Sequence, residues 1–423
     1  MLGLQYIREN KEAVLEGLKK RGFKTPEMIS QIIDLDKDRR TKQAELDKHL
    51  AESNRMAREI GSLFKAGEVE KANSLKEKSV ISKTTTKKLQ EQLNETVSLL
   101  FDLRTQVPNI PHQSVPVGNS DVDNEEIFSA GKIPDLGAGA LPHWELAIKY
   151  DLIDFELGNK ISGAGFPLYK GKGARLQRGL INYFLDRNTA AGYKEVQVPH
   201  LVNEDSAFGT GALPDKEGQM YHVQNENLYL IPTAEVPITN IYRNSLLNIS
   251  ELPIALTGYT PCFRREAGSY GAHVRGLNRL HQFDKVEIVR IEEPKNAMLA
   301  LEKMIEHVKS ILNELELPYR ILRLCGGDLG FTSALTYDFE IYSTAQKRWL
   351  EISSVSTFNS FQAERLHLRY KDEQGKKQNA HTLNGSSLAL PRVIAGILEN
   401  YQTPNGIEIP PALVTYTGFD QIK

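Results

Sequence analysis

The longest regular pattern in the chain lies between Pro26 and Pro108, where apolar residues recur in two narrow helical stripes. No proline occurs between these positions, and the only glycines are Gly61 and Gly67. The interval is rich in Lys, Glu, Gln, Leu and Ala, a composition typical of long helices. One stripe contains Leu46, Leu50, Ala57 and Ile60, and the other contains Leu89, Leu93, Val97 and Leu100. Because so narrow a stripe can bury a helix only against another helix, the pattern predicts a projecting, antiparallel two-helix coiled-coil arm with its tip near residues 65–67.

The polar faces of this predicted arm carry many basic residues mixed with carboxylates. The basic residues are Arg39, Arg40, Lys42, Arg55, Arg58, Lys76, Lys78, Lys83, Lys87 and Lys88. Such residues form the usual solvated surface of a coiled coil. They would equally neutralise the phosphates of a nucleic-acid backbone. A structural arm that promotes dimerisation is a third interpretation, and the pattern leaves all three open.

A change of composition follows the arm. Residues 105–143 are rich in proline, glycine and aspartate and show no periodic apolar pattern, which is typical of a connector. We therefore predict an N-terminal helical domain over residues 1–107, a connector over 108–143 and a second domain over 144–423.

Within the second domain, strand-like alternation is interspersed with helical patterns. Helices are predicted over residues 173–189 and 295–316, and strands over 193–202 and, as a pair, over 338–356. Pro199 interrupts the first strand and indicates a sheet edge or an irregularity. Residues 381–402 predict a polar turn that runs into an amphipathic helix. The absence of βαβ periodicity favours an α+β fold with an antiparallel sheet backed by helices.

Residues 258–289 carry the clearest chemical signal in this domain. They predict two strands joined by a long polar loop that contains Gly268, Gly271 and Gly276. The first strand ends in the adjacent residues Arg264 and Arg265, which suit a polyphosphate, because arginine stays charged and binds phosphate oxygens through paired hydrogen bonds. In isolation the same segment also fits a surface hairpin whose charges are solvated.

Composition and charge exclude several classes of protein. With 423 residues, the chain can form two domains, and its 52 Lys and Arg against 54 Asp and Glu give no overall basicity, although a local basic patch remains possible. Only Cys262 and Cys325 are present, which argues against a disulfide framework and a four-cysteine zinc site. We find no signal peptide, transmembrane span, P-loop or dinucleotide-binding fingerprint. These features predict a soluble protein of a reducing compartment.

In combination, the motifs resemble those of the seryl-tRNA synthetases of the bacterial type, which belong to class II of the aminoacyl-tRNA synthetases. The resemblance covers essentially the whole chain, including the helical arm. The matching motifs, in chain order, are VPNIPHQSVPVG (107–118), PHWELA (142–147), TAE (233–235), FRREAGSYGAHVRGLNRLHQFDKVE (263–287), EISS (351–354) and NGSSLALPR (384–392). The resemblance implies an antiparallel sheet of six or seven strands with the active site on its face, in a homodimer joined partly through the strand at Pro199.

The resemblance also implies roles for individual residues. The ATP site would contain Arg264, Arg265, Glu266, Phe283, Glu351, Ile352, Ser353, Ser354 and Arg392, and the serine pocket Thr233, Ala234, Glu235, Glu287 and Ser386. Arg264 and Arg392 would be the catalytic residues, Arg264 at the α-phosphate and Arg392 at the γ-phosphate. Phe283 would lie under the adenine, and Glu351 and Ser354 would bind Mg²⁺. His281 is predicted to be structural, and His112 and His143 are assigned no role.

The implied reaction has two steps and takes place in the cytoplasm. L-serine is first activated by ATP and Mg²⁺ to seryl-adenylate, and the seryl group is then transferred to the 3′ end of tRNA(Ser), whose long variable arm the helical arm would bind. The serine carboxylate is itself the nucleophile, so the protein must hold two anions together and neutralise charge rather than supply a base. Two alternatives are a relative that loads a carrier protein, which would not need the arm, and a degenerate structural or RNA-binding homologue.

Four positions depart from the common family pattern. Ser387 and Pro391 stand where glycine is frequent, Glu364 where a second arginine is common, and Ser360 in place of an aspartate. The first two leave the position of Arg392 in its motif unchanged, and Glu364 removes one basic side chain.

Overall fold

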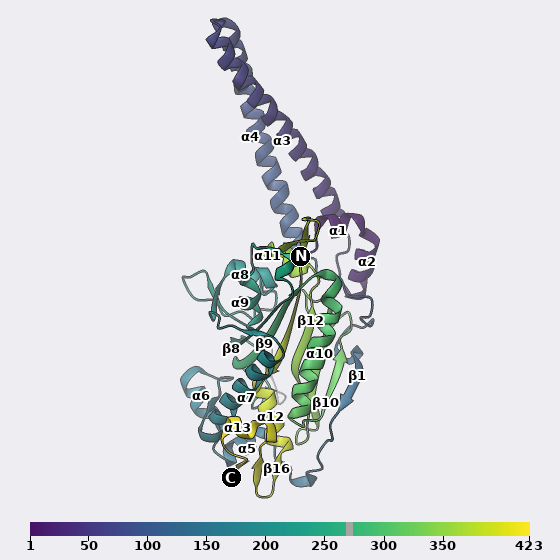
Figure 1. The fold of residues 1–423 in the computed structure, drawn as a ribbon, viewed down its shortest axis with the longest axis vertical. Coiled ribbons are helices and arrows are strands. Elements are labelled where there is room, and N and C mark those ends of the chain that lie inside the picture. Colours follow the sequence, from purple (N-terminus) through teal and green to yellow (C-terminus); the bar gives the residue numbers. More distant parts are fainter. Residues whose placement is uncertain (268–273) are drawn as a thin grey trace. The chain divides into compact units, whose positions relative to one another are not determined.

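The computed structural model describes residues 1–267 and 274–423, so Gly268 and Gly271 of the predicted loop lie outside the described residues. The chain divides into two compact units (Figure 1). The first unit consists of residues 1–19 and 23–108, and the second of residues 20–22 and 109–423. In the described residues, no helix is both long and apolar enough to cross a membrane.

Helices build the first unit. They are α1 (Leu4–Glu9), α2 (Lys11–Lys20), α3 (Met28–Lys65) and α4 (Val69–Gln106). The chain reverses at Gly67, whose φ of +78° favours glycine. Helices α3 and α4 therefore lie side by side as an antiparallel hairpin, as Figure 1 shows, and the predicted pair of long helices is confirmed.

The interior of this hairpin differs from the predicted apolar stripes. Leu46, Leu93 and Leu100 are buried, as predicted. Leu50 and Val97, however, are 43% and 46% exposed. Small and hydroxyl side chains occupy interior positions instead, among them Ala72, Ser79 and Thr96. The hydroxyls of Ser53 and Ser82, for example, lie 2.8 Å apart across the hairpin. Buried residues on α4, such as Ala72 and Ser79, recur at intervals of seven. The predicted stripes followed apolar residues only and therefore did not keep this seven-residue spacing.

The second unit is organised around an eight-stranded sheet with the strand order β1-β10-β11-β12-β15-β9-β8-β4. The strands are β1 (Glu125–Ala130), β4 (Lys194–Glu195), β8 (Ile254–Phe263), β9 (Gln282–Glu292), β10 (Tyr319–Arg323), β11 (Leu335–Ser343), β12 (Arg348–Thr357) and β15 (His381–Ala389). Every neighbouring pair is antiparallel except β4 and β8, which are parallel. The predicted α+β class with a large, mostly antiparallel sheet is confirmed.

The sheet has eight strands, whereas six or seven were predicted. The difference arises at the two edge strands, β1 and β4. Strand β1 lies within the predicted connector and pairs with β10. At the other edge, only Lys194 and Glu195 remain in the main sheet from the predicted strand over 193–202. The chain leaves the sheet before Pro199, which has no N–H for a ladder hydrogen bond. It then forms β5 (Leu201–Asn203), which pairs with β6 (Leu228–Leu230) in a separate sheet.

The prediction of a polar turn at the start of residues 381–402 is also wrong. Residues His381–Ala389 form β15, which lies between β12 and β9 in the sheet. Its side chains alternate: Leu383 is buried in the core, whereas Asn384 and Ser386 line a cavity. A strand with a polar cavity on one face lacks the apolar character on which the prediction depended.

The core of this unit lies between the sheet and the helices α7 (Gly171–Ala190), α10 (Ala297–Glu314) and α12 (Leu390–Asn400). In Figure 1, α10 lies over the sheet next to β12. The remaining helices are α5 (His143–Lys149), α6 (Phe155–Ser162), α8 (Glu204–Thr210), α9 (Glu235–Asn240), α11 (Phe361–Leu366) and α13 (Pro411–Thr417), with 3-10 turns η1 (Asp121–Asp123), η2 (Gly137–Gly139), η3 (Ile249–Glu251) and η5 (Pro294–Asn296). The remaining short strands are β2 (Ile153–Asp154), β3 (Leu168–Tyr169), β7 (Leu246–Asn248), β13 (Arg369–Lys371), β14 (Lys377–Asn379), β16 (Gln402–Thr403), β17 (Gly406–Glu408) and β18 (Gln421–Ile422).

Candidate active site

A cavity of about 310 Å³ lies over β9, β12 and β15 of the large sheet. Strand alternation places every second side chain of β9 and β15 on this face. The segment after β8 and the first turn of α12 complete the wall. Of the predicted site residues, those that line the cavity are Thr233, Glu235, Arg264, Glu266, Phe283, Glu287, Glu351, Ile352, Ser353, Ser354, Ser386 and Arg392.

Two predicted site residues do not line this cavity. The side chain of Arg265 is exposed, and its backbone N–H donates to the carbonyl of Gln219 at 2.9 Å. Ala234 is fully buried in a small apolar cluster with Ile238 and Leu256. The two adjacent arginines, which directly follow β8, are therefore separated: Arg264 lines the cavity, whereas Arg265 is exposed.

One end of the cavity is a buried, acidic pocket around Glu287 on β9. The Nζ atom of Lys285 lies 2.9 Å from Glu287 Oε2, and Asn384 Nδ2 donates to Glu287 Oε1 at 3.0 Å. The hydroxyls of Thr233 and Ser386 each lie 3.4 Å from Glu287 Oε2. These donors compensate for the burial of the Glu287 carboxyl group.

A second carboxylate, Glu235 at the start of α9, belongs to the same pocket. It accepts a hydrogen bond of 2.7 Å from Gln362 Nε2. Burial, followed by the negative charge of Glu287, raises the pKa of Glu235 to about 7. With two carboxylates and the single ammonium of Lys285, the pocket suits a small ligand with a positive charge and hydrogen-bond donors.

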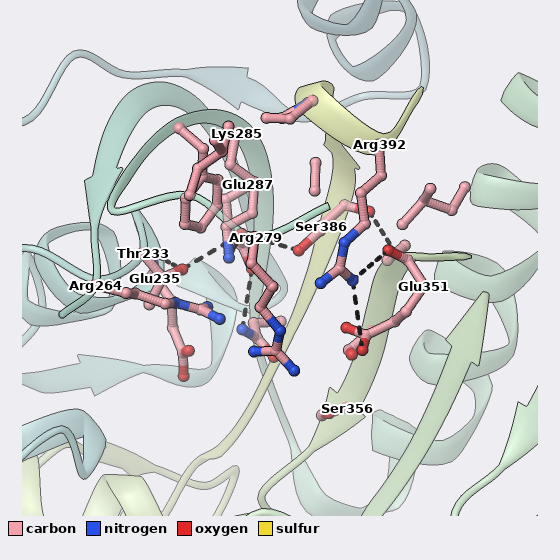
Figure 2. Close-up of a pocket in the computed structure, with 18 of the residues that line it drawn as sticks. Thr233, Glu235, Arg264, Arg279, Lys285, Glu287, Glu351, Ser356, Ser386 and Arg392 are labelled. Atoms are coloured by element: carbon pink, nitrogen blue, oxygen red, sulfur yellow. Dashed lines mark hydrogen bonds and ion pairs between the residues drawn. The ribbon is translucent and has the colours of Figure 1, made fainter. Parts of the chain in front are cut away.

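The other end of the cavity is basic. Figure 2 shows the side chains of Arg264, Arg279 and Arg392 directed toward a common space in the cavity. The guanidinium of Arg264 lies 5.3 Å from the ring centroid of Phe283. Three arginines around one space, with an aromatic face beside them, are suited to a ligand that combines phosphates with a flat ring.

Arg392 is held in place by backbone carbonyls on two sides. Its Nε atom donates to Asn278 O at 3.0 Å, and its Nη1 atom donates to Glu351 O at 2.6 Å. Burial lowers the pKa of Arg392, while the neighbouring charge of Glu351 opposes that shift. The Arg392 side chain is therefore oriented before any ligand arrives, which reduces the entropy lost on binding.

Side chains with oxygen atoms that could bind a metal lie near Arg392. Glu351 on β12 is about half exposed, and Asp338 lies opposite Ser354 across β11 and β12. The Oδ1 atom of Asp338 is buried and has no hydrogen-bond partner among the described residues. Burial and the charge of Glu351 raise the pKa of Asp338 well above its usual range. Within residues 1–267 and 274–423, no group of three or more His, Cys, Asp and Glu side chains is placed to hold a metal unaided.

Sequence reasoning missed several cavity residues, and strand periodicity could have found some of them. Lys285 alternates with Phe283 and Glu287 on β9, so a period of two places all three on one face. Asn384 alternates in the same way with Ser386, but it was hidden because β15 was predicted as a turn. Arg279 lies in an irregular segment, where no periodic signal exists.

Comparisons with known proteins find relatives along the whole chain. Residues 1–111 match the family model described as the seryl-tRNA synthetase N-terminal domain, and residues 221–401 match the class II tRNA synthetase core domain (G, H, P, S and T). The chain is 47% identical to a serine–tRNA ligase of Salinibacter ruber over 100% of this chain and 99% of the relative. It is 44% identical to one of Akkermansia muciniphila, with the same coverage.

Solved structures give the same result. The chain is similar to the crystal structure of seryl-tRNA synthetase from Pyrococcus horikoshii complexed with ATP, with a TM-score of 0.92 and 34% identity over 100% of this chain and 99% of that one. The cytoplasmic serine–tRNA ligase from Naegleria fowleri in complex with AMP aligns with a TM-score of 0.88 and 26% identity, covering 100% and 99% of the two chains.

Proposed function

The chain belongs to the seryl-tRNA synthetase family, and from this premise we propose that the cavity on the large sheet activates L-serine with ATP before transfer to the 3′ end of tRNA(Ser). The activity is that of the family, ATP-dependent ligation of serine to tRNA. The carrier-protein and degenerate-homologue alternatives are not favoured, because the chain matches both family domains, over residues 1–111 and 221–401, and aligns over its full length with serine–tRNA ligases.

The observation that carries the proposal is the proximity of an acidic pocket and an arginine cluster in one cavity. The charge of Arg264 is close enough to lower the pKa of Glu235, while its guanidinium also lies beside Phe283. A serine whose ammonium binds the acidic pocket would direct its carboxylate toward Arg264. An ATP whose adenine stacks on Phe283 would bring its α-phosphate to the same arginine.

This arrangement accounts for catalysis without a general base. The serine carboxylate attacks the α-phosphorus, the bond to the pyrophosphate oxygen breaks, and seryl-adenylate forms. Arg264 holds the two reacting anions together, and Arg392 stabilises charge on the departing pyrophosphate. Glu266 and its partner Arg279, whose Nη1 lies 3.1 Å from Glu266 Oε2, border the nucleotide. Ile352 and Ser353 contribute the floor of the site, and the Ser353 hydroxyl is already bound to Ser386 O at 2.6 Å.

The acidic pocket explains selectivity for serine. Glu235 and Glu287 provide acceptors for the ammonium and the hydroxyl, with Thr233 and Ser386 beside them. An alanine would leave at least one of these buried acceptors unpaired, at a cost of about 1–3 kcal/mol.

The oxygen ligands beside Arg392 fit Mg²⁺. Magnesium prefers hard oxygen ligands, and it keeps several waters and binds substrate phosphates, so few protein ligands are required. Glu351 and Ser354 would hold it, and the buried Oδ1 atom of Asp338, which lies opposite Ser354 and has no hydrogen-bond partner among the described residues, fits a nearby cation. When bound, the ion would supply positive charge to the phosphates.

Four wider assignments complete the proposal. The α3–α4 hairpin would bind the long variable arm of tRNA(Ser) through its basic faces. Two chains would form a homodimer partly through the segment at Pro199, and residues 1–107, 108–143 and 144–423 would act as arm, connector and catalytic domain. Cys262 and Cys325 are unpaired and buried, consistent with a reducing compartment, and we place the enzyme in the cytoplasm.

The proposed activation step can be tested without tRNA. We expect ATP–pyrophosphate exchange, measured with each of the twenty amino acids in turn, to occur with serine alone. Exchange with a different amino acid would retain the reaction and reject the pocket assignment. A lack of exchange with all twenty would contradict the proposed activity.

The raised pKa of Glu235 predicts a pH dependence of serine binding. Below about 7 the carboxyl becomes protonated and loses the charge that attracts the ammonium, so the KM for serine should rise as the pH falls. The rise should approach about tenfold for each pH unit below the pKa and level off above it. The measurement is the serine KM in pyrophosphate exchange between pH 6 and 8.5.

The matched control is Glu235→Gln, which keeps the shape and cannot ionise. Its serine KM should be high and independent of pH. An equal slope in this variant would assign the titration to a different group.

A further inference from the structure

A buried histidine outside the cavity connects two segments that line it. His143, the first residue of α5, is fully buried. Its Nδ1 atom lies 2.7 Å from Oε1 of Glu399, near the end of α12. On the opposite side of the ring, the backbone N–H of Leu277 donates to its Nε2 atom at 2.8 Å. His143 therefore bridges α12 to the segment of residues 274–280 that returns from the predicted loop.

The partners determine the tautomer of this histidine. Nε2 accepts a hydrogen bond from a backbone N–H and must be unprotonated, whereas Nδ1 faces a carboxylate and carries the proton. Glu399 also accepts from the backbone N–H of His143 at 2.9 Å and from Gln346 Nε2 at 2.9 Å. The hydroxyl of Ser343 donates to the other carboxylate oxygen. These hydrogen bonds lower the pKa of Glu399 despite its burial, so it stays ionised and orients the ring.

Further contacts attach the same segment to the same helix. Arg392, in the first turn of α12, donates from Nε to Asn278 O at 3.0 Å. The side chain of Asn278 in turn donates from Nδ2 to Gln346 Oε1 at 3.0 Å, and Gln346 binds Glu399. Two successive residues are thus tied to α12. Asn278 is hydrogen-bonded to Arg392, and Leu277 is hydrogen-bonded to His143, which Glu399 orients.

The packing leaves no space for this connection to shift. Gly276 has a φ of +68°, and a Cβ atom at this position would lie 2.3 Å from His143 Nε2. The guanidinium of Arg275 lies 5.0 Å from the ring centroid of Trp144, next to His143 in the chain. Residues 275–277 therefore lie directly against the two aromatic residues at the start of α5.

We infer that His143 is a positioning residue for the ATP half of the cavity. By accepting the Leu277 N–H, it holds residues 277–280 in register with α12, so that Arg279 and Arg392 meet the same polyphosphate. His143 touches neither substrate, and the serine pocket around Glu287 does not depend on it. This inference rests on the proposed function, because it assigns the phosphates of ATP to these arginines.

Two isosteric substitutions separate the role of each ring nitrogen. In His143→Asn, the side-chain amide can still donate to Glu399 but cannot reach Leu277. In His143→Gln, the longer side chain can present its carbonyl oxygen where Nε2 lies and restore the acceptor. We expect His143→Asn to weaken ATP binding about tenfold, the effect of losing one buried hydrogen bond, with serine binding nearly unchanged. We expect His143→Gln to restore most of the ATP affinity.

The measurement is direct titration of ATP and, separately, of serine by calorimetry, together with the ATP and serine KM in pyrophosphate exchange. Equal ATP affinity in His143→Asn and the unaltered chain, or an equal loss of ATP and serine affinity, would overturn the inference.

If His143→Asn does not fold, Gly276→Ala displaces the same contact from the loop side and leaves Glu399 intact. It should weaken ATP binding alone, and unchanged affinity there would also overturn the inference. Failure of the proposed function would be seen differently, as absent exchange in the unaltered chain, while the ATP titrations would still decide the role of His143.

Discussion

Replacing Arg264 with alanine is expected to lower serine-dependent ATP–pyrophosphate exchange by about 10³-fold, the size of effect seen when a donor to developing charge is removed from an active site. Arg264 lies beside Phe283 and close enough to Glu235 in the acidic pocket to affect its pKa. Its loss removes the positive charge that holds the two reacting anions together. Single-turnover formation of seryl-adenylate measures the effect directly, because tRNA is not involved. Binding of tRNA should remain nearly unchanged.

Arg265→Ala is the matched comparison for this prediction. It removes the same charge from the adjacent residue, but the Arg265 side chain is exposed and outside the cavity. The two substitutions thus differ in position rather than in chemistry, and Arg265→Ala should reduce exchange only slightly. Equal losses would mean that general positive charge near the end of β8 matters, rather than contact with the substrates. Retained exchange in Arg264→Ala would contradict the site assignment.

Removing the distal part of the α3–α4 hairpin should separate activation from transfer. We expect a chain lacking residues 43–95 to retain pyrophosphate exchange and to lose about 10²-fold or more in tRNA charging, as expected when several phosphate contacts are removed. The junction is practical because Lys42 Nζ and Thr96 Oγ1 lie 2.8 Å apart, so a short glycine-rich turn can join them. The ion pairs of Asp36 with Arg8, Arg39 and Arg40 at the base remain.

The control for the deletion keeps the hairpin and changes only its charge. Replacing the basic residues between positions 55 and 88 with glutamine should weaken tRNA binding and reduce its dependence on salt, because fewer counterions are released. Comparison of charging at low and moderate salt would distinguish these variants. Equal charging rates with and without residues 43–95 would refute the proposed role of the hairpin and favour a structural arm.

The acidic pocket illustrates how far strand periodicity can predict a site. Glu287 and Phe283 were assigned through the family resemblance, and Lys285 lies on the same face of β9 by simple alternation. The charge balance of the pocket, however, depends on Glu235, which comes from α9, far away in the chain. The pKa of Glu235 rises because folding buries it near Glu287, an effect that no local pattern records.

Strand β15, in contrast, shows where strand periodicity fails to predict a site. Asn384 and Ser386 look like turn residues because they are polar, and the pattern predicted a turn. They occupy a central strand because one face of the sheet lines a polar cavity. A binding face removes the apolar alternation by which a buried strand is recognised, so prediction failed where function was located.

The sequence by itself determined the pair of long helices, the α+β class and, through the order of its motifs, the family and its reaction. These properties follow from local composition and from motifs whose residues lie close together in the chain. Only the tertiary structure decided that Arg264 faces the cavity while Arg265 does not, and that His143 supports residues 277–280 from outside it. The first outcome depends on neighbours from other elements, Phe283 beside Arg264 and Gln219 at the backbone of Arg265. The second depends on contacts between segments separated by more than 100 residues, those of His143 with Leu277 and Glu399, and such contacts exist only once the chain is folded.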